Sequence, residues 1–345
     1  MKKQLYIIAS CLHLLAYGYI LDPKNHILDT LYSELKIEQP VTFIPVKMPN
    51  IYEIVINGTS YIVRLNEEYN RFARVIECNL HTYAAEKGFG PQIFYHNPDK
   101  HIIIMEKLQA KELVPADIEA CLPKLVEALH AMHNSPIESR HIHTFTTNTI
   151  KKIYNLDQHA NPRQLNTFAI YGHLLRLEKL FEDDYKVMIH QDLHPFNIFF
   201  DGVNFKFIDF ETPHLDTPFV DLAHVALFYC MNEEQEKKLL SLYFNREITV
   251  LDYIKLKAMK CFVCTKFICW MLNSLPTSTK DSHHSIDLSV LEYTPPLNIF
   301  LKCAVTNIKN AKWRYRLAIS AIKTFEELIE QIDTYLLKNI VNTNF

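Results

Sequence analysis

Hydrophobic and polar positions in the first third of the chain alternate in the way that is typical of β-strands. Several runs are rich in β-branched and aromatic residues, and one stretch between them has helical spacing that Gly88 ends. Asn57-Gly58, between the second and third runs, is a strong signal for a hairpin turn. The predicted elements are helices at 26–36 and 71–87 and strands at 41–46, 51–56, 60–65, 92–96 and 102–105.

Helical spacing dominates the rest of the chain. It begins near Pro115 and is interrupted at 187–209, where short apolar runs flank a polar segment. Residues 250–340 are helical by spacing and rich in aromatic side chains. The whole pattern predicts an α+β protein of two parts, a small antiparallel sheet over 1–108 and a larger, mainly helical part over 109–345.

The interruption at 187–209 contains the most informative motif of the sequence. Asp192 and Asn197 lie five residues apart within HQDLHPFN, between two apolar flanks, and Asp209 closes a Phe205–Ile208 strand. Phosphoryl transfer needs a carboxylate that orients the accepting hydroxyl and takes its proton, and two hard oxygen ligands that hold Mg²⁺ against the nucleotide phosphates. A β-hairpin that returns Asp209 beside the other two would supply all three groups. We therefore predict Asp192 as the base and Asn197 and Asp209 as metal ligands.

These motifs resemble those of the aminoglycoside phosphotransferase and choline kinase superfamily, which reads HxDxxxxN, then hDxE, then DLA. The chain has HQDLHPFN at 190–197, IDFE at 208–211 and DLA at 221–223, in that order. The resemblance covers residues 40–230 and implies a bilobal protein-kinase-like fold that uses ATP and Mg²⁺. The alternative is a proline-containing turn between buried strands whose polar residues have no catalytic role.

The resemblance also assigns residues of the small lobe to the nucleotide. Arg64, on the strand at 60–65, is expected to contact the phosphates, and Glu77 on the following helix is expected to hold it in place. Arg74-x-x-Glu77 matches the helix motif of the choline kinase branch. The alternative is that Arg64 is an edge-strand residue in a surface ion pair.

Two further segments of the small lobe are expected at the nucleotide. Asn50 lies in the expected phosphate loop, where the glycine usual in the family is missing and the backbone cannot approach phosphate as closely. Glu106 and Leu108 lie where the lobes should join, and their backbone is expected to meet the adenine.

The acceptor side rests on Glu211 and on aromatic residues. Glu211 is expected on the same face of an extended strand as Asp209, and the resemblance makes it a ligand of a second Mg²⁺ or a contact for an ammonium group. Trp270 and Trp313 would offer faces to a quaternary ammonium, worth ~0.5–2 kcal/mol each, but they fit aromatic helix cores equally well. Asp221 is expected to cap the next helix and to brace the catalytic loop.

The predicted function is Mg·ATP-dependent phosphorylation of a hydroxyl on a small molecule, with an amino alcohol such as choline or ethanolamine as the leading acceptor. A second acceptor class is an aminoglycoside or other antibiotic, whose positive charges the acids Glu233, Glu234 and Glu236 would meet; the alternative is that this charged run is a solvated helix face. A different class of function is a pseudokinase that acts as a binding module, which the missing glycine favours and the intact catalytic motif opposes.

Composition narrows the class of protein. The 345 residues are 48% hydrophobic and 22% charged, which is ordinary for a globular protein, and a net charge of −3 gives no basic footprint for nucleic acid. Six glycines in the whole chain exclude a glycine-rich P-loop. Cys261-x2-Cys264 has no second pair to complete a zinc site, so we expect reduced thiols in a buried helix of a cytoplasmic protein. The oligomeric state stays open.

The first residues raise the question of a signal sequence. Lys2-Lys3 precede a short apolar run before Cys11 that faintly resembles a lipoprotein cleavage box. The run is shorter than a normal signal core, so we expect an ordinary N-terminal helix. The rest of the chain has no uncharged stretch of about 18 residues, and no transmembrane segment is expected.

Overall fold

The protein is described from a computed structural model, which covers residues 22–46, 48–66, 70–109, 118–137, 144–159, 167–211, 213–274, 297 and 311–342. The expected N-terminal helix and the run before Cys11 lie outside these residues. The chain forms two compact units. The first unit comprises Met1–Lys111, Ser135–Glu138 and Phe199–Thr212, and the second comprises Glu112–Asn134, Ser139–Ile198 and Pro213–Phe345. Within the described part of the chain, none of the helices combines the length and apolar character that crossing a bilayer requires.

The first unit is built on an antiparallel sheet of five strands in the order β1-β2-β3-β5-β4. The predicted succession of three strands, a helix and two strands is confirmed, and Asn57 and Gly58 form the β2–β3 turn, both with positive φ. Its elements are α2 (Pro23–Ser33), β1 (Val41–Ile44), β2 (Ile51–Ile56), β3 (Thr59–Leu65), α3 (Arg71–Glu86), β4 (Ile93–Asn97) and β5 (Ile102–Glu106).

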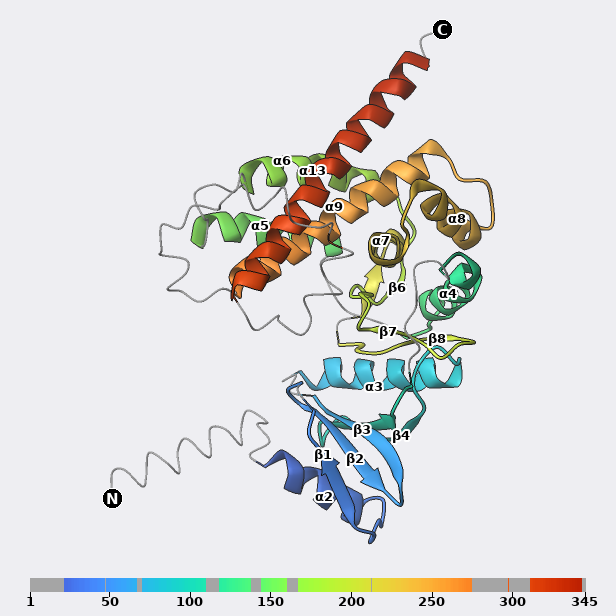
Figure 1. Ribbon diagram of the computed structural model, residues 1–345, viewed down its shortest axis with the longest axis vertical. Helices are drawn as coiled ribbons and strands as arrows, with labels where there is room; N and C mark the ends of the chain where they lie inside the picture. Colours follow the sequence, from blue (N-terminus) through green and yellow to red (C-terminus); the bar gives the residue numbers. More distant parts are fainter. Residues whose placement is uncertain are drawn as a thin grey trace, which may run out of the picture. The chain divides into compact units, whose positions relative to one another are not determined.

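The two faces of this sheet have separate apolar cores. Ile27 and Leu31 of α2 pack against alternate residues of β2, β3 and β5, among them Val63. Cys78 of α3 packs with Ile103 and with other residues of opposite alternation. Because successive side chains of a strand point to opposite faces, α2 and α3 cover opposite faces of the sheet (Figure 1). The same alternation directs Arg64, the neighbour of Val63, toward the face of α3.

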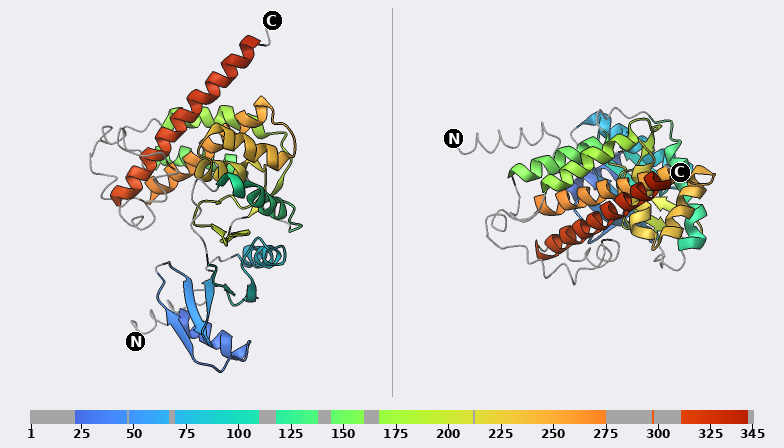
Figure 2. Two further views of the ribbon diagram at one scale, coloured as in Figure 1. Left: turned by 45° about the vertical axis from the view of Figure 1, so that its right-hand side comes forward. Right: turned by 90° about the horizontal axis from the view of Figure 1, so that it is seen from above.

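The second unit is mainly helical, as predicted. Figure 2 shows α9 lying between α13 on one side and the pair α5 and α6 on the other. Within the described residues, the helices of this unit are α4 (Ile118–His133), α5 (Phe145–His159), α6 (Thr167–Glu178), the short 3₁₀ helix η2 (Lys179–Phe181), α7 (Phe219–Tyr229), α8 (Glu233–Phe244), α9 (Val250–Asn273) and α13 (Ala311–Asn342).

Helix α9 is the central helix of the second unit. Thr249 and Asp252 form a capping box that fixes its first turn. Cys261 and Cys264 are fully buried free cysteines, in agreement with the predicted buried helix. Burial raises the pKa of the Cys264 thiol to about 12, so the thiol stays protonated.

Short strands flank the HQDLHPFN motif. β6 (Val187–Ile189) pairs antiparallel with β9 (His214–Asp216) and ends directly before the motif begins. The predicted hairpin after the motif is also present, since β7 (Ile198–Phe200) and β8 (Phe205–Phe207) form a two-stranded sheet.

Candidate functional site

The loop that carries Asp192 is a compact turn held by its own backbone. The N–H of His194 donates to the carbonyl of Asp192 at 2.8 Å, and the N–H of Asn197 donates to the carbonyl of His194 at 2.9 Å. The Nδ2 amide of Asn197 donates to the Asp192 carbonyl at 3.0 Å. The structure therefore brings the predicted base and one predicted metal ligand together in the second unit.

Asp221 braces this loop from the first turn of α7. Its two carboxylate oxygens accept the N–H groups of His190 and Gln191, both at 2.8 Å, and His133 Nε2 lies 3.0 Å from Oδ2. Burial alone would raise the pKa of Asp221, but the hydrogen bond and charge of His133 hold that pKa below its usual value. The predicted bracing is confirmed. The predicted capping role is wrong, because Pro218 occupies the N-cap and the carboxylate of Asp221 turns to the loop.

The Asp192 carboxylate has a partner that the motif does not contain. Lys266, on α9, donates to Oδ1 of Asp192 at 2.6 Å and to the carbonyl of Gln191 at 2.9 Å. His194 Nε2 lies 3.5 Å from the other oxygen, Oδ2. Burial opposes ionisation of Asp192, but the charges of Lys266 and His194 outweigh it and hold the pKa of Asp192 well below its usual range. Asp192 is thus an ionised carboxylate, as a general base must be.

Arg64 is the centre of the charged cluster in the first unit. Its Nε donates to Glu77 at 2.8 Å, and the predicted pair between strand and helix is therefore present. Its terminal amino group lies 3.0 Å from Asp209 and 2.5 Å from Glu211. Glu77 is almost fully buried and also accepts from the Asn66 amide. Burial would lower the pKa of Arg64, but the three carboxylates raise it further above its usual value.

Asp209 and Glu211 reach this cluster by a route that the sequence did not predict. β8 ends at Phe207, and Asp209 has φ +70°, so the expectation of an extended strand through Glu211 is wrong. The chain turns here because Phe210 is buried against Phe89 and His81, with ring centroids 6.4 and 4.9 Å apart. Both carboxylates nevertheless meet the same guanidinium.

The two segments predicted to contact the nucleotide, at Asn50 and at 106–108, already make hydrogen bonds within the first unit. Asn50 has φ +58°, a left-handed conformation that glycine and asparagine tolerate best, and its carbonyl accepts the N–H of Leu65 at 2.9 Å. Asparagine thus makes the tight turn without glycine. The N–H of Glu106 donates to the carbonyl of Gln92, and its carboxylate binds Lys206 at 2.7 Å. The Glu106 side chain therefore forms a structural ion pair with Lys206. Leu108 is half-buried and lies beyond the end of β5.

The two tryptophans have different surroundings. Trp270, on α9, is 48% exposed and lies one helical turn beyond Lys266, on the same face of the helix. Trp313, on α13, already has a cation over its ring, since the Arg316 guanidinium carbon lies 5.8 Å from the centroid. Only Trp270 combines an exposed ring with a position near the Asp192 loop.

Two of the three acids expected to meet a polycation have other partners. Glu236 is buried and bound by Lys257 at 2.9 Å and by Lys260 and the Tyr253 hydroxyl. Glu233 binds Lys237 and the hydroxyl of Tyr335. Glu233 and Glu236 therefore join α8 to α13 and α9, and the exposed Glu234 is the acid of this run that the structure leaves for the expected role.

The residues present suit Mg²⁺, although no cage is preformed. Among the described residues, no three His, Cys, Asp or Glu side chains are placed to hold a metal by themselves. Mg²⁺ usually needs only one or two carboxylates besides substrate phosphates and water. Asp209 and Glu211 are 31% and 54% exposed hard-oxygen donors in a cluster of three carboxylates and one guanidinium. The excess of negative charge in this cluster fits a divalent cation.

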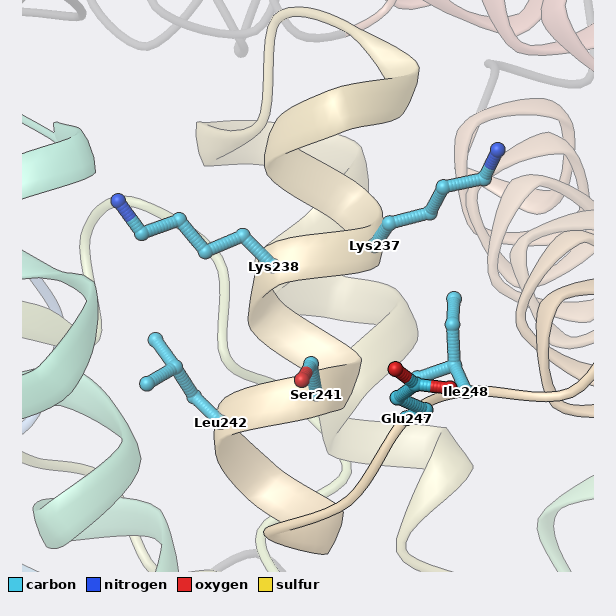
Figure 3. A pocket seen from close by; sticks show the side chains of 6 residues that line it. All are labelled: Lys237, Lys238, Ser241, Leu242, Glu247 and Ile248. Carbon is cyan, nitrogen blue, oxygen red and sulfur yellow. The ribbon is translucent and has the colours of Figure 1, made fainter.

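A surface hollow of about 480 Å³ lies on α8 and the segment after it. Figure 3 shows Lys237 and Lys238 extending to opposite sides of the helix, so their ammonium groups do not converge. Its other lining residues are Ser241, Leu242, Glu247 and Ile248. None of the predicted site residues lines this hollow.

Comparisons with known proteins agree with the motifs. Residues 49–244 match the model of the phosphotransferase enzyme family. The choline kinase LicA from Streptococcus pneumoniae has a TM-score of 0.57 and 21% identity, over 71% of this chain and 89% of that chain. An ethanolamine kinase from Plasmodium vivax has a TM-score of 0.58 and 16% identity, over 87% and 88%. APH(2")-IIa, in a ternary complex with streptomycin and ATP, has a TM-score of 0.50 and 15% identity, over 73% and 92%.

At these identities the likeness to solved structures shows the fold. The prediction of a protein-kinase-like fold, with a small antiparallel sheet and a larger mainly helical part, is confirmed. No curated protein matches the sequence.

Proposed function

The chain belongs to the phosphotransferase enzyme family, and we propose that it transfers the γ-phosphoryl group of Mg·ATP to a hydroxyl group of a small molecule. The observation that carries this proposal is the Asp192 loop, in which an ionised carboxylate is fixed by Lys266 and by the backbone that Asp221 braces. In the proposed step the hydroxyl oxygen attacks the γ-phosphorus, its proton passes to Asp192, and the bond to the bridging oxygen of ADP breaks.

The first unit supplies the residues proposed for the nucleotide. Arg64, held by Glu77, would contact the phosphates, and bidentate geometry suits a guanidinium to this task. Asp209 and Asn197 are proposed as ligands of Mg²⁺, and Glu211 as a ligand of a second ion. When bound to these residues, the ions would supply positive charge that offsets the negative charge of the phosphates. Asn50 would border the phosphates, and the backbone at Glu106 and Leu108 would meet the adenine.

An amino alcohol such as choline or ethanolamine is the proposed acceptor. A choline kinase and an ethanolamine kinase are among the similar structures, and the exposed ring of Trp270 lies one turn from Lys266. Trp313 and Glu211 are weaker acceptor contacts, because Arg316 and Arg64 already bind them. An aminoglycoside receives less support, since two of the three expected acids, Glu233 and Glu236, already form ion pairs with lysines.

The test is ADP release from Mg·ATP in the presence of choline, ethanolamine, kanamycin or glucose. We expect acceptor-dependent release with an amino alcohol and loss of release when Mg²⁺ is chelated. Turnover with glucose alone would exclude the amino-alcohol acceptor and leave the phosphotransferase assignment in place. If calorimetry detects no Mg·ATP binding and no acceptor releases ADP, the chain is a binding module.

The Asp209→Asn variant tests the metal ligand within the same assay. We expect the Mg²⁺ concentration for half-maximal rate to rise at least about tenfold, the loss typical of even a residue that supports a metal ligand. Asp99→Asn is the matched control, because Asp99 pairs with Arg71 on the surface of the same unit at 2.5 Å. Equal Mg²⁺ requirements in the two variants would exclude Asp209 as a ligand.

A further inference from the structure

We propose that Lys266 is a positioning residue for the phosphoryl transfer, which holds Asp192 and the peptide before it in the geometry that accepts the hydroxyl proton. The inference rests on the proposed function, because Lys266 acts on Asp192, the proposed base. Lys266 itself lies outside the HQDLHPFN motif. Lys266 lies 74 residues after Asp192 in the chain and reaches it from α9.

The first observation is the backbone at Gln191. This residue has φ +60°, a left-handed conformation that is costly for a side chain other than glycine or asparagine. Asp221 accepts its N–H at 2.8 Å, and Lys266 donates to its carbonyl at 2.9 Å. Both polar groups of the strained residue are therefore held from outside the loop, by α7 and by α9. Strain of this kind persists only where surrounding contacts over-determine it.

The second observation is that the two carboxylate oxygens of Asp192 have different contacts. Lys266 occupies Oδ1 at 2.6 Å, while Oδ2 lies 3.5 Å from His194 Nε2. The ammonium of Lys266 thus fixes one oxygen and leaves Oδ2 as the oxygen to which the hydroxyl proton moves.

The third observation is the environment of Lys266 itself. Its ammonium lies 6.0 Å from the centroid of the Phe145 ring. His224, fully buried on α7, has its pKa lowered to about 4 by burial and by the charge of Lys266, and therefore adds no second positive charge. Lys266 consequently carries the charge that balances Asp192.

The experiment compares steady-state rates of Lys266→Met and Lys266→Arg with choline as acceptor and with water as acceptor in Mg·ATP hydrolysis. We expect Lys266→Met to lower kcat about a hundredfold, the effect of misplacing a catalytic group by about 1 Å. The KM values for ATP and choline should change less than about threefold, because Lys266 acts through Asp192. Lys266→Arg keeps the charge and should recover at least about a tenth of the wild-type kcat.

Lys255→Met is the matched control. Lys255 lies on the same helix and forms a half-buried ion pair with Asp184, outside the Asp192 loop. We expect this variant to keep wild-type kcat even if its melting temperature falls. An equal loss of kcat in Lys255→Met and Lys266→Met would overturn the positioning role. If Lys266→Met does not fold, Lys266→Gln is measured against the same criteria.

The Asp192→Asn background gives the decisive comparison. A residue that acts through Asp192 should have no further effect once the carboxylate is gone, so the double variant should be no slower than Asp192→Asn alone. Additive losses, or a wild-type kcat in Lys266→Met, would overturn this inference and leave the proposed function intact. The absence of phosphotransfer in the wild type, or full activity in Asp192→Asn, would overturn the proposed function itself.

Discussion

The two units hold their central charges in opposite ways. In the first unit one guanidinium, that of Arg64, faces the carboxylates of Glu77, Asp209 and Glu211. In the second unit one carboxylate, that of Asp192, faces the ammonium of Lys266. The first arrangement has more negative than positive charge, an excess that the proposed Mg²⁺ would offset. The second is balanced as it stands, which suits a base that must be ionised and fixed before the acceptor arrives.

The strongest test of the balanced centre is Asp192→Asn. The substitution keeps the shape and removes the proton acceptor, so we expect kcat to fall about 10²–10⁴-fold. Mg·ATP binding should stay near the wild-type value, because the Asp192 carboxylate is not a proposed metal ligand and Asn197 contacts the backbone carbonyl of Asp192, which the substitution leaves in place. Rates are measured by ADP release and binding by titration calorimetry. A variant that keeps more than about a tenth of the wild-type rate would show that Asp192 is not the base.

The strongest test of the unbalanced centre is Arg64→Met. Removing one partner of a buried ion pair leaves an uncompensated buried charge at Glu77, and we expect a loss of about 3–5 kcal/mol in the free energy of unfolding. Glu77→Gln should cost less, because Arg64 retains two carboxylate partners. Urea unfolding measures both variants.

Mg²⁺ sharpens this comparison. In Arg64→Met the carboxylates of Asp209 and Glu211 lose their guanidinium, so Mg²⁺ should stabilise this variant more than the wild type. The control is Arg71→Met, a variant of the same unit that breaks an exposed ion pair with Asp99. If Mg²⁺ stabilises wild type, variant and control by the same amount, the carboxylates of the first unit do not attract the ion.

The sheet and helix α3 of the first unit could be predicted from the sequence because their signals are local. Alternation in the strands, the Asn57-Gly58 turn and the helix that Gly88 ends each specify structure over a few residues, and the structure follows all of them. The Arg64–Glu77 pair was also predictable, since it joins a strand to the next helix. The contacts of Arg64 with Asp209 and Glu211 were not, because a left-handed residue and a buried phenylalanine set the path of the chain there.

The partner of Asp192 could not be identified from the sequence for a related reason. Lys266 belongs to no motif, and helical periodicity gives no information about which loop a helix end will meet. A partial signal was present, because a lysine between Thr265 and Phe267 in an apolar helix must find a compensating partner. That signal indicates a buried ion pair without naming its acid.

The pH dependence of stability tests whether the second unit tolerates additional positive charge. His224 donates from Nδ1 to the carbonyl of Val220 at 2.8 Å and is fully buried, with a pKa of about 4. In the unfolded chain its pKa is about 6.5, so the unfolded state binds more protons below that pH, and stability is lost as the pH falls from 6.5 through 4. We expect this residue to cost roughly 2 kcal/mol at pH 5 relative to pH 8.

Urea unfolding of wild type and His224→Asn at the two pH values measures this contribution. The variant has lower stability at pH 8, but its stability should fall less on acidification, by roughly the same 2 kcal/mol. An identical loss of stability in both proteins would mean that folding does not lower the pKa of His224. The conclusion that Lys266 alone balances the charge of Asp192 would then be wrong.

The smallest expected effect concerns the acceptor and separates two tryptophans of the second unit. Trp270 has an exposed ring one turn from Lys266, whereas the ring of Trp313 already faces Arg316 at 5.8 Å. A cation–π contact at an exposed site is worth about 0.5–1 kcal/mol. Trp270→Leu should therefore raise the KM for choline roughly two- to fivefold with little change in kcat. Trp313→Leu should leave the KM for choline unchanged, because the Arg316 guanidinium already lies over that ring. Equal increases in both variants would show that the ammonium does not bind at Trp270, and an increase confined to Trp313→Leu would move the acceptor site to α13.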